Sequence, residues 1–160
     1  KSYLALSTLS NFSQEELWPN LYDQLPNLRK DYGAIYFVSV LFRLLPEWEE
    51  DRMLIITDFL YSLIDSNWPD FMKFRPSTIL TLMNLNSSRC LDYIPKWLDS
   101  NKTPYWASRY AALIGAEIML LKNKSNNKIE NIVFPESDTH YFVNQKLNQV
   151  RNKQINLSTR

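Results

Sequence analysis

Two side chains in the sequence have the chemistry to act in catalysis, the single histidine and the single cysteine. His140 stands close to Asp138 in the segment SDTHYF, and an imidazole in that setting could serve as a general base. No serine or cysteine nucleophile motif accompanies it, which favours a surface or helix-capping role. Cys90 lies near the expected start of a helix in SSRCLD, a setting that could activate the thiol. A buried structural thiol is the favoured interpretation.

Binding of a metal ion or a phosphate group is not indicated. A metal site needs several His, Cys or carboxylate side chains at ligand spacing, and the sequence shows no such group. Only 2 glycines are present, which excludes a glycine-rich phosphate loop. We therefore predict no catalytic residue, no metal, no cofactor and no enzymatic activity.

A strip of mostly acidic residues runs along one predicted helix, residues 46–66. Most positions of this helix are apolar, so we expect it to be buried on nearly every side. The polar residues that remain return to one line of the helix surface, at spacings of four, seven and eleven residues. They are Glu47, Asp51, Asp58, Ser62 and Asp65. Two interpretations stay open, a recognition face for a cationic partner and a solvated face.

If consecutive helices alternate in direction, acidic and aromatic residues gather on one side of the molecule. Trp and Tyr are frequent anchors of protein interfaces, and an acidic rim speeds association with basic partners. Each aromatic residue taken alone, Trp97 included, is more typical of a core position. The predicted partner-binding residues are Glu47, Asp51, Asp58, Asp65, Trp68, Asp70, Asp99, Tyr105 and Trp106.

The charge of the chain is uneven along its length. Residues 1–100 hold 9 basic and 13 acidic side chains, whereas residues 101–160 hold 9 and 4. The basic residues near the end could contact nucleic acid phosphates. Their low density and the lack of an aromatic platform favour a solvated helix instead, so we expect no direct nucleic acid binding. They are Lys146, Arg151, Lys153 and Arg160.

Helical patterns cover most of the chain. Ser13 and Glu16 form a capping box, which predicts the start of a helix, and Pro26 is expected to end that helix or to lie just past its end. Pro95 is expected to kink or split the helix in which it lies. The β-branched run 129–134 could be extended. The expected helices are residues 13–26, 30–45, 46–66, 76–86, 88–100, 104–122 and 137–154.

These patterns predict an all-α fold. The 2 glycines leave the chain without the turn residues that short-strand sandwiches and hairpins need. Several helices are apolar almost all round, which favours layered antiparallel helix pairs, either HEAT-like or an irregular α-α bundle of about six or seven helices. A face of Ala and Gly residues on helix 104–122 should let neighbouring helices approach closely. With 160 residues, we expect one domain, residues 1–160, with a mobile polar tail from about residue 155.

The sequence favours a cytoplasmic protein. Its single cysteine cannot form an internal disulfide, and no charged segment followed by an apolar one opens the chain. The longest apolar run, residues 105–121, carries Arg109 and Glu117 and is shorter than the roughly 20 residues of a membrane span. We interpret it as a buried core helix and expect no membrane contact.

Taken together, the chain resembles a small all-α bacterial immunity protein of a contact-dependent growth inhibition system, a class of polymorphic toxin system. The resemblance is carried by the stand-alone size, the cysteine usage, the lack of catalytic chemistry, the acidic segment PEWEED, and the aromatic helices DYGAIYFVSVLF and PYWASRYAALIG.

The resemblance implies a function in binding. Such proteins neutralise a cognate toxin C-terminal domain, often a nuclease with a basic substrate groove, by blocking its active site. It further implies a monomer that binds 1:1 and whose carboxylates occupy the positions of nucleic acid phosphates. The alternative is a HEAT-like adaptor or regulatory module without catalysis. An enzyme built on His140 is a third and more distant possibility.

Overall fold

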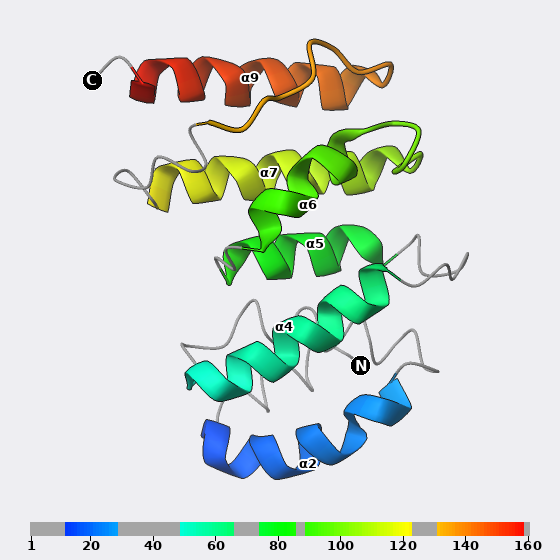
Figure 1. Cartoon of the computed structure of the whole chain (residues 1–160), viewed down its shortest axis with the longest axis vertical. Helices are drawn as coiled ribbons and strands as arrows, with labels where there is room; N and C mark the ends of the chain where they lie inside the picture. Colours follow the sequence, from blue (N-terminus) through cyan, green and yellow to red (C-terminus); the bar gives the residue numbers. More distant parts are fainter. Residues whose placement is uncertain (1–11, 29–48, 66–73, 86–88, 123–130, 159–160) are drawn as a thin grey trace. The chain divides into compact units, whose positions relative to one another are not determined.

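The structure, a computed structural model, describes residues 12–28, 49–65, 74–85, 89–122 and 131–158. These residues form six α-helices and no strand, which confirms the predicted all-α fold (Figure 1). The expected helix 30–45 lies outside the described residues. The helices are α2 (Gln14–Leu28), α4 (Glu50–Ile64), α5 (Arg75–Asn84), α6 (Cys90–Leu98), α7 (Trp106–Lys122) and α9 (Tyr141–Ser158).

The chain divides into two compact units, residues 1–78 and 79–160, and α5 spans the boundary between them. A single domain over the whole chain stays a prediction. Of the helices that the structure describes, none combines the length and the apolar character that a bilayer crossing requires.

In the first unit, α2 begins at the predicted capping box. The Ser13 N–H donates to Glu16 Oε2 at 2.8 Å, and the Glu16 N–H donates to Ser13 Oγ at 3.3 Å. The prediction that Pro26 ends this helix is wrong, because α2 continues to Leu28. Pro26 lies in the last turn, where its missing N–H removes one hydrogen bond, and a second proline, Pro19, lies earlier in the same helix.

The buried part of α4 is its C-terminal two thirds. Burial on nearly every side is wrong for the N-terminal turns, since Leu54 is 61% exposed. The helix begins at Glu50, later than expected, with Asp51 favourably placed in its first turn. The buried residues of α4 are Ile56, Thr57, Phe59, Leu60, Tyr61, Leu63 and Ile64.

In the second unit, α7 is the central helix and packs against both α6 and α9. Gly115 lies on its small-residue face, where an added Cβ would stand 2.3 Å from Sδ and 2.7 Å from Cβ of Met83 on α5. Only glycine allows α5 and α7 to approach so closely. This confirms the role predicted for the small residues, of which Ala111, Ala112 and Ala116 are buried.

The helices on either side of α7 differ in detail from the expectation. Pro95 does not split α6, which runs without interruption from Cys90 to Leu98. A proline in so short a helix removes a single backbone hydrogen bond. Cys90 is buried, as expected for a structural thiol.

The last helix, α9, begins at Tyr141 and continues to Ser158, so it both starts and ends four residues later in the sequence than predicted. Residues 131–140 precede it without regular secondary structure and are called the lead-in segment below.

Candidate functional site

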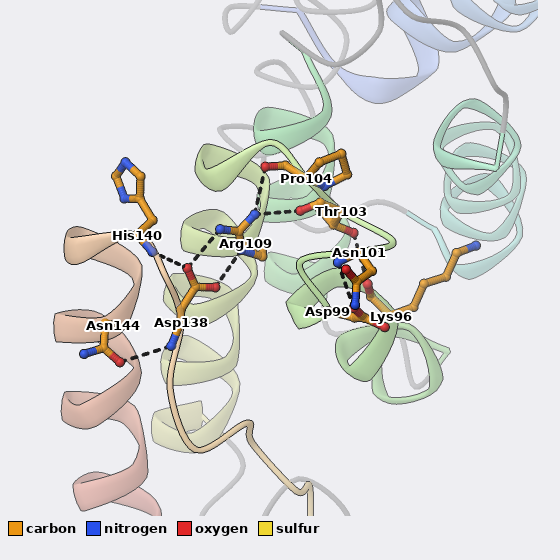
Figure 2. A network of polar contacts seen from close by, with 9 residues as sticks. All are labelled: Lys96, Asp99, Asn101, Thr103, Pro104, Arg109, Asp138, His140 and Asn144. Atoms are coloured by element: carbon orange, nitrogen blue, oxygen red, sulfur yellow. Dashed lines mark hydrogen bonds and ion pairs between the residues drawn. The ribbon is translucent and has the colours of Figure 1, made fainter.

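A buried ion pair between Arg109 on α7 and Asp138 in the lead-in segment holds the two together (Figure 2). Arg109 Nε donates to Asp138 Oδ2 at 2.7 Å, and Nη2 donates to Asp138 Oδ1 at 2.9 Å. The two side chains are only 3% and 4% exposed. Two parallel bonds from the planar guanidinium to the carboxylate fix both position and orientation. The pair therefore sets where the lead-in segment lies against α7.

The same guanidinium also holds the loop between α6 and α7. Arg109 Nη1 donates to the carbonyl oxygens of Thr103 at 2.8 Å and Pro104 at 2.9 Å. Thr103 in turn donates from Oγ1 to the carbonyl of Lys96 on α6 at 3.0 Å. Arg109 on α7 thus connects the α6–α7 loop with the lead-in segment, and Thr103 connects that loop to α6.

Asp138 organises the start of α9. Its Oδ1 accepts the His140 N–H at 2.8 Å, and its own N–H donates to Asn144 Oδ1 at 3.1 Å. Burial would raise the pKa of Asp138, but the hydrogen bonds from Arg109 and from the His140 N–H, together with the charge of Arg109, outweigh it. The pKa of Asp138 therefore lies below its ordinary value, and the carboxylate stays ionised at neutral pH.

The imidazole of His140 does not contact Asp138. Figure 2 shows the ring directed away from the carboxylate, which is bonded to the backbone N–H instead. The ring stacks on Trp106, with centroids 4.3 Å apart and planes inclined by 2°, and its Nδ1 is buried without a hydrogen-bond partner. The sequence allowed a general base in which Asp138 would bond to the imidazole of His140. The structure does not show that arrangement, because Asp138 bonds to the backbone N–H of His140.

Four aromatic side chains meet where α7 and α9 begin. We call Trp106, His140, Tyr141 and Phe142 the aromatic cluster. The ring of Phe142 lies 6.3 Å from Trp106, 5.9 Å from His140 and 5.5 Å from Tyr141, measured between centroids. Trp106 is 37%, Phe142 54% and Tyr141 73% exposed. The cluster is therefore an ordered aromatic surface open to solvent.

A pocket of about 350 Å³ lies on another side of the lead-in segment, against the end of α6. Its volume is in the range of small-molecule sites. Asp99 at its rim accepts the Asn101 N–H at 2.9 Å and lies 3.7 Å from the Lys102 ammonium. The lining residues are Pro95, Leu98, Asp99, Ser100, Val133, Phe134, Pro135, Ser137 and Asp138.

Three of the basic residues near the end of the chain form ion pairs or hydrogen bonds within the second unit. Lys146 and Lys153 on α9 both pair with Glu117 on α7, and Arg151 donates to the carbonyl of Glu136 at 3.0 Å. Burial would raise the pKa of Glu117, but the bonds and charges of the two lysines outweigh it and lower it. Arg160 lies outside the described residues.

The predicted partner-binding residues fall into three groups. Glu47, Trp68 and Asp70 lie outside the described residues. Asp51 and Asp58 on α4 and Asp65, the C-cap residue of that helix, are exposed in the first unit. Asp99, Tyr105 and Trp106 belong to the second unit, where Asp99 lines the pocket and the rings of Tyr105 and Trp106 are 6.5 Å apart. That these residues bind a partner stays a prediction.

Sequence reasoning missed the residues that order this site. Arg109 was seen only as a charge within an apolar run, and Asp138 only as a neighbour of His140. A signal for the pair existed, since a charged residue inside a buried helix needs a partner of opposite charge. The exposed position of Phe142 has no comparable signal, because it depends on how α9 packs on α7.

Comparisons with known proteins give one curated relative and no match elsewhere. No protein-family model matches the chain, and no solved structure matches it. The chain is similar to the "Bilin biosynthesis protein CpeY" of Synechococcus sp. (strain WH8020), with 34% identity over 144 residues. The match covers 83% of this chain and 34% of that protein, so the chain spans about a third of the relative's length.

This similarity corrects the functional predictions made from the sequence. The resemblance to an immunity protein of contact-dependent growth inhibition is wrong, because the relative is a bilin biosynthesis protein. The predicted toxin partner, the inhibitor function and the absence of enzymatic activity are wrong for the same reason. The HEAT-like adaptor without catalysis finds no support either. Small size, helical patterns and an acidic segment are shared by many helical proteins, and none of them identifies a ligand.

Proposed function

We propose that this chain is a helical part of a protein of bilin biosynthesis and that it binds a bilin. The observation that carries the proposal is the 34% identity to the CpeY protein over 144 residues, which covers 83% of the chain. Because the chain spans about a third of that relative, the proposal concerns bilin binding and not the relative's complete activity. A cytoplasmic location belongs to the same proposal.

The second unit offers surfaces suited to such a molecule. A bilin is an open-chain tetrapyrrole, with conjugated rings that stack on aromatic side chains and propionate groups that carry negative charge. The aromatic cluster and the pocket beside the lead-in segment provide apolar and aromatic contacts together with a few polar groups. Ligand sites in proteins are commonly built in this way.

The proposal is tested by titrating the purified chain with biliverdin and with a reduced bilin. We expect saturable 1:1 binding in the micromolar range, seen as a shifted and sharpened long-wavelength absorption band. The urea-unfolded chain is the control, because it retains the same side chains without the site. A spectral change that does not saturate, or that the unfolded chain reproduces, would contradict the proposal.

A further inference from the structure

We infer that the aromatic cluster is the platform on which the pyrrole rings of the bilin stack. This inference rests on the proposed function and assigns it to named residues. The first observation is the geometry of the cluster. Trp106 and His140 are parallel within 2° at 4.3 Å, so they already form the kind of stack that a planar conjugated ligand extends.

The platform is ordered before any ligand arrives. His140 is held by its N–H bond to Asp138, and Asp138 is held by two bonds from Arg109. Trp106 is the first residue of α7, the helix that also carries Arg109. A surface already fixed in its binding conformation loses little conformational entropy when a ligand binds. The buried ion pair therefore acts as the support of the platform.

The exposure of the cluster leaves room for the ligand. Phe142 and Tyr141 are 54% and 73% exposed, although both stand beside other aromatic rings. Single exposed apolar residues are common on protein surfaces, whereas contiguous apolar patches are typical of interaction sites and ligand grooves. Stacking on this group would remove aromatic surface from water on the protein and on the ligand together.

The charge of the unit fits an anionic tetrapyrrole. Residues 79–160 contain 11 basic and 6 acidic side chains, a net charge of +5. The ion pairs of Glu117 and Asp138 described above take up these two acids and three of the bases, which leaves 8 basic and 4 acidic side chains outside them. The propionate groups of a bilin would therefore enter a favourable field. A protein partner could also use exposed aromatic residues as anchors, and the experiment separates the two.

The experiment compares bilin titrations of the wild-type chain with those of Phe142→Ser and Trp106→Ala. We expect each substitution to weaken bilin binding at least tenfold, which corresponds to about 1.4 kcal/mol. Leu121→Ser is the matched control, since Leu121 lies on α7 in the same unit and is 51% exposed. It should leave the affinity unchanged. Far-UV circular dichroism verifies that each variant is folded, and Tyr141→Ser replaces any variant that is not.

The outcomes distinguish the two proposals. If the wild-type chain binds no bilin, the proposed function and this inference both fail. If it binds bilin and the cluster variants bind equally well, the function stands and the platform is wrong. Loss of binding to a co-purifying protein in these variants, with bilin affinity unchanged, would also overturn the inference and assign the cluster to a protein interface.

Discussion

The Arg109 guanidinium and the Asp138 carboxylate join residues 29 positions apart through two hydrogen bonds of 2.7 and 2.9 Å. The remaining bonds of Arg109 go to two backbone carbonyls, and the remaining bonds of Asp138 go to the start of α9. The pair is thus the point at which the α6–α7 loop, α7 and the lead-in segment are held together.

Arg109→Met should lower the free energy of unfolding by about 3–5 kcal/mol, because it leaves the Asp138 carboxylate buried without its partner. The double variant Arg109→Met with Asp138→Leu should lose less than the sum of the two single variants, since both buried charges are then removed. Urea unfolding of the four proteins measures this coupling. Additive losses would show that the pair is not an energetic unit.

The stability of the protein should depend on the ionisation of Asp138. Its pKa is lowered in the folded protein, so the unfolded chain takes up the proton first as the pH falls. The stabilisation is fully present above about pH 4, the ordinary pKa of an aspartate, and is lost as the pH falls through the lower folded-state pKa.

Asp138→Asn should therefore flatten the acid limb of the pH–stability profile, measured by urea unfolding between about pH 3 and pH 7. Asp92→Asn, which changes an exposed carboxylate on α6, is the control and should leave the limb unchanged. An unchanged limb in the Asp138 variant would assign the acid sensitivity to other groups, Glu117 first among them.

Gly115→Ala should destabilise the protein although alanine is the better helix former by about 1 kcal/mol. The new Cβ would stand 2.7 Å from Cβ of Met83, an atom that cannot move without its helix. We expect a loss of about 1–3 kcal/mol, typical of an overpacked core. Gly115→Ala should cost less in a Met83→Ala background than in the wild type, because Met83→Ala removes the Sδ and Cγ atoms that the new Cβ would meet, and thermal unfolding of the four proteins measures the difference. A stabilised Gly115→Ala variant would mean that α5 and α7 have room to separate.

Ser13→Ala should cost about 1 kcal/mol by removing the cap of α2, where Ser13 Oγ accepts the Glu16 N–H. Because the aromatic cluster belongs to the second unit, the bilin affinity of this variant should equal that of the wild type. Thermal unfolding and a bilin titration on the same sample test both statements. A tenfold loss of affinity would place part of the bilin site in the first unit.

Local signals in the sequence predicted local structure well. The capping box of Ser13 and Glu16, the small-residue face around Gly115 and the helical periods all depend on neighbours within a few residues. The prolines were harder to interpret. Pro26 and Pro95 each cost a hydrogen bond, and each nevertheless lies within a helix that continues past it.

The candidate site could be predicted only in part. Trp106 was among the predicted partner-binding residues and is 37% exposed, and that it binds a partner stays a prediction. The ion pair of Arg109 and Asp138 was not predicted, because it depends on contacts between segments far apart in the sequence. The function was mispredicted since it was inferred from composition and overall size, which are compatible with many activities.

The hydrogen bonds of Arg109 also imply a kinetic linkage between two loops. The carbonyls of Thr103 and Pro104 and the carboxylate of Asp138 share a single guanidinium, so displacement of the Arg109 side chain removes support from both loops at once. The α6–α7 loop and the lead-in segment should therefore open as one cooperative unit. Their backbone amides would then exchange with solvent at a common rate, and a ligand resting on Trp106 and His140 would slow exchange in both loops together.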